Sequence, residues 1–101
     1  MTNAYTVEIT TQAYQDLVEV VEWYSLQRPG LEKEFTLSFE ACLRRLERNP
    51  LGFQIIFKGA RSIFLQRFPY KVIYKTYGNT IKVYTVLHHS RSPKLIRKRL
   101  K

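Results

Sequence analysis

The residues of this sequence that could do chemistry are basic and aromatic, and most of them lie between positions 61 and 91. Cleavage of RNA through its 2′-hydroxyl needs a base, an acid for the leaving oxygen, and cations that stabilise the charge on the phosphorane. Lys71, Lys82 and Arg91 could supply the cations. His88 or His89 could transfer one proton near neutral pH. This stretch therefore contains some of the residue types that a ribonuclease site would need.

The group for the second proton transfer is missing from this stretch. Residues 49–101 contain no Asp or Glu, and no aromatic residue follows Arg91. A phenol such as that of Tyr84 is a poor base, because its ordinary pKa is about 10. The same side chains could instead bind a target without catalysis, or form a solvated surface. The candidates for target or anion binding are Arg61, Arg67, Lys75, Lys82, Tyr84 and His89.

Two runs of β-branched and aromatic residues, Lys71–Tyr77 and Thr80–His88, flank the turn sequence Gly78-Asn79 and predict a β-hairpin. A two-residue loop would place Lys75 opposite Lys82. The other expected pairs are Tyr77 with Thr80, Thr76 with Ile81, Tyr74 with Val83, Ile73 with Tyr84, Val72 with Thr85, Lys71 with Val86 and Tyr70 with Leu87.

The two faces of this hairpin should differ in character. The expected core face carries Tyr70, Val72, Tyr74, Ile81, Val83 and Leu87. The other face carries Lys71, Lys75, Lys82, Tyr84 and His88 around Ile73. Two lysines directly opposite each other destabilise a strand pair, so we expect the basic face to be solvated or to meet an anion.

Before the hairpin, alternating apolar residues predict a strand over Ala4–Thr10. Helical patterns follow over Thr11–Gln27 and from Leu31 to Asn49-Pro50, separated by Pro29-Gly30. The apolar stripes are Ala13, Tyr14, Leu17, Val20, Val21 and Tyr24 on the first helix, and Leu31, Phe35, Phe39, Cys42, Leu43 and Leu46 on the second. Gln15, Asp16, Glu19 and Glu22 lie opposite the first stripe.

After the helices we expect a ragged strand over Phe53–Phe57 and a second strand over Arg61–Phe68, before the hairpin. This order, β-α-α-β-β-β with a possible further strand, predicts an α+β fold. A helical hairpin should cover one face of a mainly antiparallel sheet and leave the basic face uncovered. We expect a single domain over residues 1–93. The basic tail, residues 94–101, should form one or two helical turns or be disordered until bound.

Composition and charge narrow the possible partners, location and cofactors of this protein. All eight carboxylates lie in residues 1–48 beside five Lys/Arg, whereas residues 49–101 hold twelve Lys/Arg, which favours an acidic or polyanionic partner. The sequence shows neither a signal peptide nor a membrane span, and its single cysteine, Cys42, is expected in the core, so we expect a cytoplasmic protein without a membrane partner. It shows no metal-ligand cluster and no phosphate-binding glycine loop, so we expect no cofactor.

The order of elements resembles the RelE/ParE superfamily, the toxins of bacterial type II toxin–antitoxin pairs. The resemblance extends from Tyr5 to about Lys94. Its more specific residues are Arg61, Leu65, Arg67-Phe68-Pro69-Tyr70-Lys71-Val72-Ile73-Tyr74, Ile81, Val83, Val86, His88, Arg91 and Pro93, with Asn49-Pro50 at the end of the second helix. The resemblance implies a toxin that forms a hetero-oligomer with an acidic antitoxin.

The two branches of the superfamily differ in their target. RelE-like toxins cleave mRNA on the ribosome, and by that resemblance Lys71, Arg91 and His88 would be the catalytic residues of this chain. ParE-like toxins inhibit DNA gyrase. The sequence around Pro69 and His88 looks more like the ParE branch, and the C-terminal tyrosine of the RelE pattern is absent. Gyrase inhibition is therefore favoured over mRNA cleavage, and a non-catalytic basic binding module or an inactive toxin relative is the second alternative.

Three apolar residues fall outside the two helical stripes, namely Trp23, Leu26 and Leu37. They are either helix-crossing contacts and isolated surface residues, or a surface for a partner. Since the resemblance implies an antitoxin that wraps around the toxin, these three residues are the candidate antitoxin-binding residues.

Overall fold

A five-stranded sheet in the order β1-β5-β4-β3-β2 forms the centre of the molecule. The computed structural model describes residues 5–100, so Ala4 of the first predicted strand and Lys101 of the tail lie outside the described residues. The elements are β1 (Thr6–Ile9), α1 (Thr11–Gln27), α2 (Leu31–Arg48), β2 (Gln54–Phe57), β3 (Ala60–Phe64), β4 (Tyr70–Tyr77), β5 (Thr80–His88) and α3 (Pro93–Arg99). The predicted α+β fold is confirmed.

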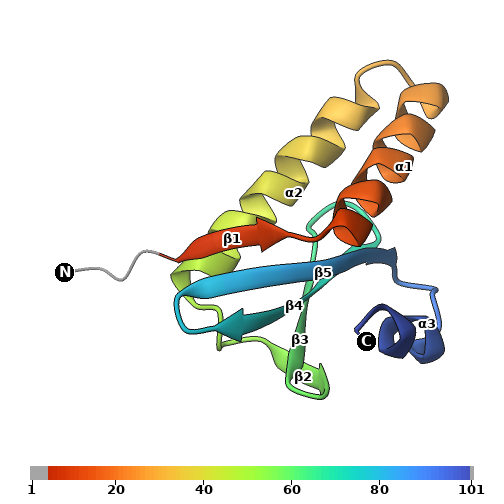
Figure 1. The fold of residues 1–101 in the computed structure, drawn as a ribbon. Helices are drawn as coiled ribbons and strands as arrows, with labels where there is room; N and C mark the ends of the chain where they lie inside the picture. Colours follow the sequence, from red (N-terminus) through yellow and green to blue (C-terminus); the bar gives the residue numbers. More distant parts are fainter. Residues whose placement is uncertain (1–4, 101) are drawn as a thin grey trace.

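The sheet is mixed but mostly antiparallel. β1 pairs in parallel with β5, whereas the pairs β2–β3, β3–β4 and β4–β5 are antiparallel. The helical hairpin of α1 and α2 lies on one side of the sheet, as predicted (Figure 1). Within the described residues, no helix is both long enough and apolar enough to cross a membrane.

Local sequence determines where the two long helices begin and end. The hydroxyl of Thr10 accepts a hydrogen bond from the Ala13 amide at 3.1 Å and caps α1. Gly30, with φ of 93°, provides the left-handed turn before α2. Acidic residues in the first turn of α2 and basic residues in its last turn complement the helix dipole. The helices are therefore specified locally, and their packing is specified by the apolar stripes.

The core between the helices and the sheet contains Phe35, Phe39, Cys42 and Leu46 of α2, packed over the inner face of β4 and β5. The predicted stripe of α2 is confirmed. On α1 the prediction fails at two positions. Tyr14 is 63% exposed, and Asp16, expected on the polar face, is only 7% exposed. Asp16 is buried because it contacts the edge of β5, which helical periodicity cannot reveal.

A β-bulge changes the predicted register of the hairpin. The pairs from Tyr77 with Thr80 to Tyr74 with Val83 are as predicted. Beyond them the register shifts, so that the observed pairs are Ile73 with Thr85, Val72 with Val86, Lys71 with Leu87 and Tyr70 with His88. The extra residue turns Val86 toward the helices and Leu87 toward the opposite face, and both side chains are buried.

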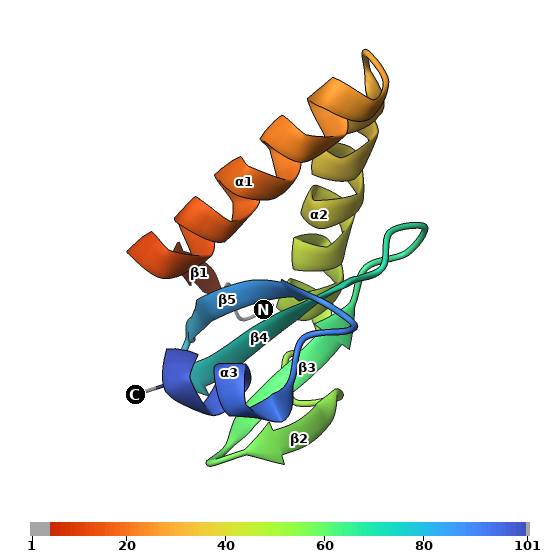
Figure 2. The same cartoon turned by 90° about the vertical axis from the view of Figure 1, so that its right-hand side faces the viewer.

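The face expected to be uncovered is partly covered by α3 (Figure 2). Ile96 of α3 packs with Ala60, Ile73 and Leu87 in a second apolar cluster. The tail is therefore helical over most of its length and docked on the sheet, because its apolar residues match those that the bulge places on this face. The strand expected over Arg61–Phe68 is shorter than predicted, and its partner strand begins after the Phe68-Pro69 turn.

The buried thiol of Cys42 gives a test of the core. Burial raises its pKa to about 11, although the nearby Arg45 guanidinium acts in the opposite direction. Since the thiolate is the reactive form, the native protein should react with an aromatic disulfide reagent at pH 8 at least about 100-fold more slowly than free cysteine. The rate should become that of free cysteine in concentrated guanidinium chloride. Fast reaction of the native protein would contradict the packing.

Candidate functional site

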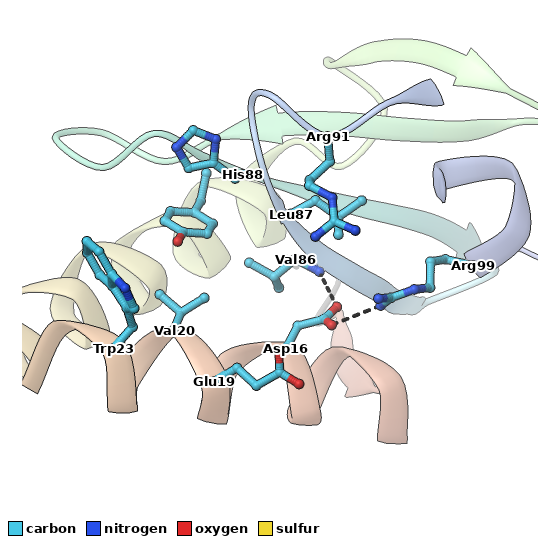
Figure 3. Close-up of a pocket in the computed structure, with 10 residues that line it drawn as sticks. Asp16, Glu19, Val20, Trp23, Val86, Leu87, His88, Arg91 and Arg99 are labelled. Atoms are coloured by element: carbon cyan, nitrogen blue, oxygen red, sulfur yellow. Dashed lines mark hydrogen bonds and ion pairs between the residues drawn. The ribbon is translucent and has the colours of Figure 1, made fainter. Parts of the chain in front are cut away.

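A pocket of about 310 Å³ lies between α1 and the end of β5 (Figure 3). Its lining combines acidic, basic and aromatic side chains, namely Asp16, Glu19, Val20, Trp23, Tyr70, Val86, Leu87, His88, Arg91 and Arg99. Three of these, His88, Arg91 and Trp23, were predicted from the sequence as functional residues. The fold thus brings together residues for which the sequence suggested different roles.

The carboxylate of Asp16 organises one wall of this pocket. Its Oδ2 accepts hydrogen bonds from the Thr85 hydroxyl at 2.5 Å and from the Val86 amide at 3.0 Å. Its Oδ1 accepts from Arg99 Nη1 at 2.9 Å and from the Gln12 amide at 3.0 Å. A buried carboxylate is costly unless it is paired and hydrogen-bonded, and here both conditions are met.

The same contacts complete the edge of the sheet. β1 pairs with β5 only as far as Val83, so among residues 5–100 the rest of β5 has no strand partner on that side. The hydroxyl of Thr10 donates to the Tyr84 carbonyl at 3.0 Å, and Asp16 accepts from the Val86 amide. Two side chains from the start of α1 therefore satisfy backbone groups that a longer β1 would have paired.

His88 and Arg91 form the other end of the pocket. His88 Nδ1 lies 2.8 Å from the Ser90 hydroxyl and accepts from the Ser90 amide at 3.1 Å. Its ring meets Tyr70 edge-on with centroids 5.3 Å apart. Because Nδ1 accepts from a backbone amide, the neutral ring carries its proton on Nε2. The turn after β5 thus fixes the orientation of the imidazole beside the exposed Arg91.

Lys71 is not part of this arrangement. It lines a different pocket of about 270 Å³, between α3 and the opposite face of the sheet, together with Phe57, Ile73 and Arg97. Tyr70 pairs with His88, and successive residues of a strand point to opposite faces. The candidate nuclease residues Lys71 and His88 therefore lie on opposite sides of the sheet.

Two of the predicted binding arginines have structural contacts. Arg61 donates to the Phe53 carbonyl at 2.7 Å and so holds the loop before β2. Arg67, in the loop between β3 and β4, forms an ion pair with Glu34 of α2 at 3.0 Å. His89, by contrast, stacks edge-on against the exposed ring of Phe64, with centroids 4.9 Å apart. These three residues line neither Lys71's pocket nor that of His88.

Lys75, Lys82 and Tyr84 do come together, near the turn of the β4–β5 hairpin. Both ammonium groups lie within 6 Å of the Tyr84 ring centre, at 5.8 Å and 5.4 Å. The Tyr84 and Tyr77 hydroxyls share a hydrogen bond of 2.7 Å. Desolvation, and then this hydrogen bond, raises the pKa of Tyr84 to about 12. The phenol is therefore protonated at neutral pH, when a general base would have to be deprotonated.

The three predicted antitoxin-binding residues are exposed but do not form one patch. Trp23 lines the pocket beside α1, Leu26 is 83% exposed near the end of α1, and Leu37 lines a hollow on α2 with Arg45 and Arg67. A more apolar groove lies between the two helices and has a volume of about 300 Å³. Its lining residues are Tyr14, Leu17, Val18, Val21, Glu22, Phe35, Thr36 and Phe39.

Three residues of the first pocket, Asp16, Glu19 and Arg99, were not predicted from the sequence as functional residues. The pairing of Asp16 with Arg99 spans 83 positions, so no local pattern predicts it. The apolar residues within the basic tail were a signal that the tail docks on the fold. Ile96 anchors the tail helix to the sheet, and this helix places Arg99 beside the sheet edge. Among the described residues, no group of three or more His, Cys, Asp or Glu could hold a metal ion.

Comparison with known proteins identifies relatives along most of the chain. A family model described as the ParE toxin of type II toxin-antitoxin system, parDE, matches residues 7–93. Toxin ParE2 of Mycobacterium tuberculosis, from strain CDC 1551 / Oshkosh and from strain ATCC 25618 / H37Rv, is 29% identical over 82 residues. This match covers 80% of the chain and 78% of the relative.

Solved structures share the fold at lower sequence identity. The chromosomal ParDE toxin–antitoxin system from P. aeruginosa gives a TM-score of 0.75 at 16% identity, covering 86% of this chain and 98% of the other. The RelBE2 toxin–antitoxin complex of Mycobacterium tuberculosis gives 0.59 at 23% identity, with coverages of 90% and 98%. A mutant of E. coli toxin RelE in the free state gives 0.61 at 12% identity, with coverages of 96% and 95%.

Removing the Asp16 carboxylate should strongly destabilise the protein. Asp16→Ala leaves the Arg99 guanidinium and the Val86 amide without their acceptor, and breaking a buried ion pair in this way costs about 3–5 kcal/mol. Asp16→Asn should lose less, because the amide keeps one acceptor oxygen. Urea unfolding measures the loss. Glu19→Ala, an exposed position on the same helix, should change stability by less than about 0.5 kcal/mol. Equal stabilities for Asp16→Ala and Glu19→Ala would refute the role of Asp16.

Proposed function

The chain belongs to the ParE toxin family of type II toxin–antitoxin systems, and we propose that it inhibits DNA gyrase and is neutralised by a cognate antitoxin. The observation that carries the choice of target is the separation of the candidate nuclease residues. Lys71 lines one pocket, whereas His88 and Arg91 line another on the opposite face of the sheet.

Ribonuclease chemistry needs its cations and proton-transfer groups around one phosphate. In this fold a phosphate bound beside His88 and Arg91 would have the sheet between it and Lys71. The high pKa of Tyr84 removes another potential base. An inhibitor that acts by contact needs no such convergence, so the geometry supports inhibition of an enzyme over cleavage of mRNA.

The antitoxin partner is supported by the apolar groove between α1 and α2. The groove exposes Tyr14 and Val18, which have no packing partner on their outer side among the described residues. An amphipathic helix or extended segment could bury these side chains by laying its apolar face along the groove. Two of the solved structures that share this fold are the ParDE toxin–antitoxin system and the RelBE2 toxin–antitoxin complex.

Purified protein should block supercoiling by DNA gyrase, or trap cleaved DNA, and should leave mRNA intact on translating ribosomes. Supercoiling assays on a closed plasmid and primer extension on translated mRNA measure the two activities. In a nuclease, Lys71→Ala should lower the rate by about 10²–10³-fold through loss of a transition-state cation. Codon-specific mRNA cuts that disappear in Lys71→Ala would therefore reverse the choice of target.

The groove can be tested with the short acidic protein expected from the adjacent reading frame. Val18→Glu should weaken its binding by at least about 10-fold, because a charge in an apolar groove loses hydration without gaining a partner. Titration calorimetry measures the affinity, and growth on co-expression reports loss of neutralisation. Gln15→Glu adds the same charge on an exposed position of α1 outside the groove and should bind normally. Unchanged binding by Val18→Glu would exclude the groove.

A further inference from the structure

We propose that the basic face of this protein, formed by the hairpin lysines Lys75 and Lys82 and by the exposed cations of α3, binds the phosphate backbone of double-stranded DNA. This inference rests on the proposed function, because gyrase holds DNA as its substrate. It adds a second contact that involves the DNA itself, independent of any contact with the enzyme.

Most of the carboxylates are concentrated on one side of the molecule. All eight carboxylates lie on β1, α1 and α2, and seven of them are on the two helices. Helix α3 lies on the opposite side of the sheet from α1 and α2 (Figure 2). The outward-facing Lys75 and Lys82 are on this side, and the exposed cations of α3 are Lys94, Arg97 and Lys98. A surface on which positive charge predominates attracts a polyanion over a distance and orients it before contact.

The hairpin lysines repel each other, although both make an attractive cation–π contact with Tyr84. Lys75 and Lys82 are directly opposed in the β4–β5 ladder, and like charges so placed repel each other. Both ammonium groups lie over the ring of Tyr84. Glu8 lies at 4.0 Å from Lys82 and is 60% exposed, so it gives weak compensation. A phosphate between the two lysines would relieve their repulsion.

The chemistry of this cluster favours a phosphate backbone over a folded protein. Protein interfaces bury an apolar centre with a polar rim. Here two apolar side chains in the centre of the face, Ile73 and Leu87, are already covered by Ile96 of α3, whereas the exposed Phe64 lies beside Lys71, away from the lysine pair. What the cluster leaves accessible is lysine and phenol hydroxyl, since Tyr77 is exposed beside Tyr84. Such groups contact phosphate and sugar without reading base sequence.

Binding should therefore be independent of sequence and strongly dependent on salt. Neutralisation of about five phosphates by Lys75, Lys82, Lys94, Arg97 and Lys98 would give a slope of log K against log salt of about −4 to −5. Non-specific binding of this kind has dissociation constants of about 10⁻⁴–10⁻⁶ M at physiological salt. The affinity should be measurable at 50 mM salt, where counterion release contributes most.

The experiment measures anisotropy of a labelled 20-base-pair duplex with the full chain and no gyrase, between 50 and 200 mM salt. The double variant Lys75→Glu/Lys82→Glu should bind at least about 10-fold more weakly and should lower the slope by about 2. The control Lys33→Glu/Arg44→Glu makes the same change in net charge at exposed positions of α2, and it should lose little affinity. If the glutamate pair does not fold, as judged by circular dichroism, Lys75→Gln/Lys82→Gln replaces it.

Three outcomes would overturn the proposal. If the wild-type protein does not bind the duplex at 50 mM salt, the proposed DNA-binding site is excluded. An equal loss in the two double variants shows that net charge acts, without a defined face. A single-stranded RNA of equal length that binds at least about 10-fold tighter than the duplex assigns the face to RNA. Supercoiling assays distinguish this proposal from gyrase inhibition. Inhibition without duplex binding would support gyrase inhibition alone, and duplex binding without inhibition would support the DNA contact alone.

Discussion

The buried carboxylate of Asp16 joins three parts of the fold that are far apart in the sequence. It accepts from the backbone of β5 at Val86, from the side chain of Thr85, and from Arg99 at the end of α3. A buried ion pair of this type is weak evidence for net stability, because desolvation offsets the attraction. Its value lies in specificity, because each partner would be left unsatisfied in any other arrangement of α1, β5 and α3.

The position of this carboxylate follows from the shortness of β1. With β1 ending at Ile9, the chain turns into α1 at Thr10, and the second half of β5 becomes an edge. An unpaired edge invites pairing with another chain. The first turns of α1 cover it with one hydroxyl and one carboxylate. The same arrangement leaves room between α1 and the end of β5 for the pocket that contains His88 and Arg91.

The bulge in β5 has an equally large effect on the opposite face. It shifts the alternation of side chains by one residue, so that Val86 faces the helices and Leu87 faces α3. Because Leu87 and Ile73 form a platform for Ile96, the basic tail becomes a docked helix. The cations of α3 then lie on the same side as the hairpin lysines. One inserted residue thus couples core packing to the distribution of surface charge.

The sequence alone determined the two long helices, the order of the strands, the α+β class and the turn at Gly78-Asn79, because periodicity, caps and turn residues act over a few positions. It also carried the resemblance to the toxin superfamily, whereas it left the helix α3 open. Tertiary structure decided the bulge, the burial of Asp16, the docking of α3 and the separation of Lys71 from His88. Each of these depends on contacts between distant segments or on a register shift of one residue. A register shift of one residue moves a side chain to the other face of the sheet, and the local hydrophobic pattern does not indicate where such a shift occurs.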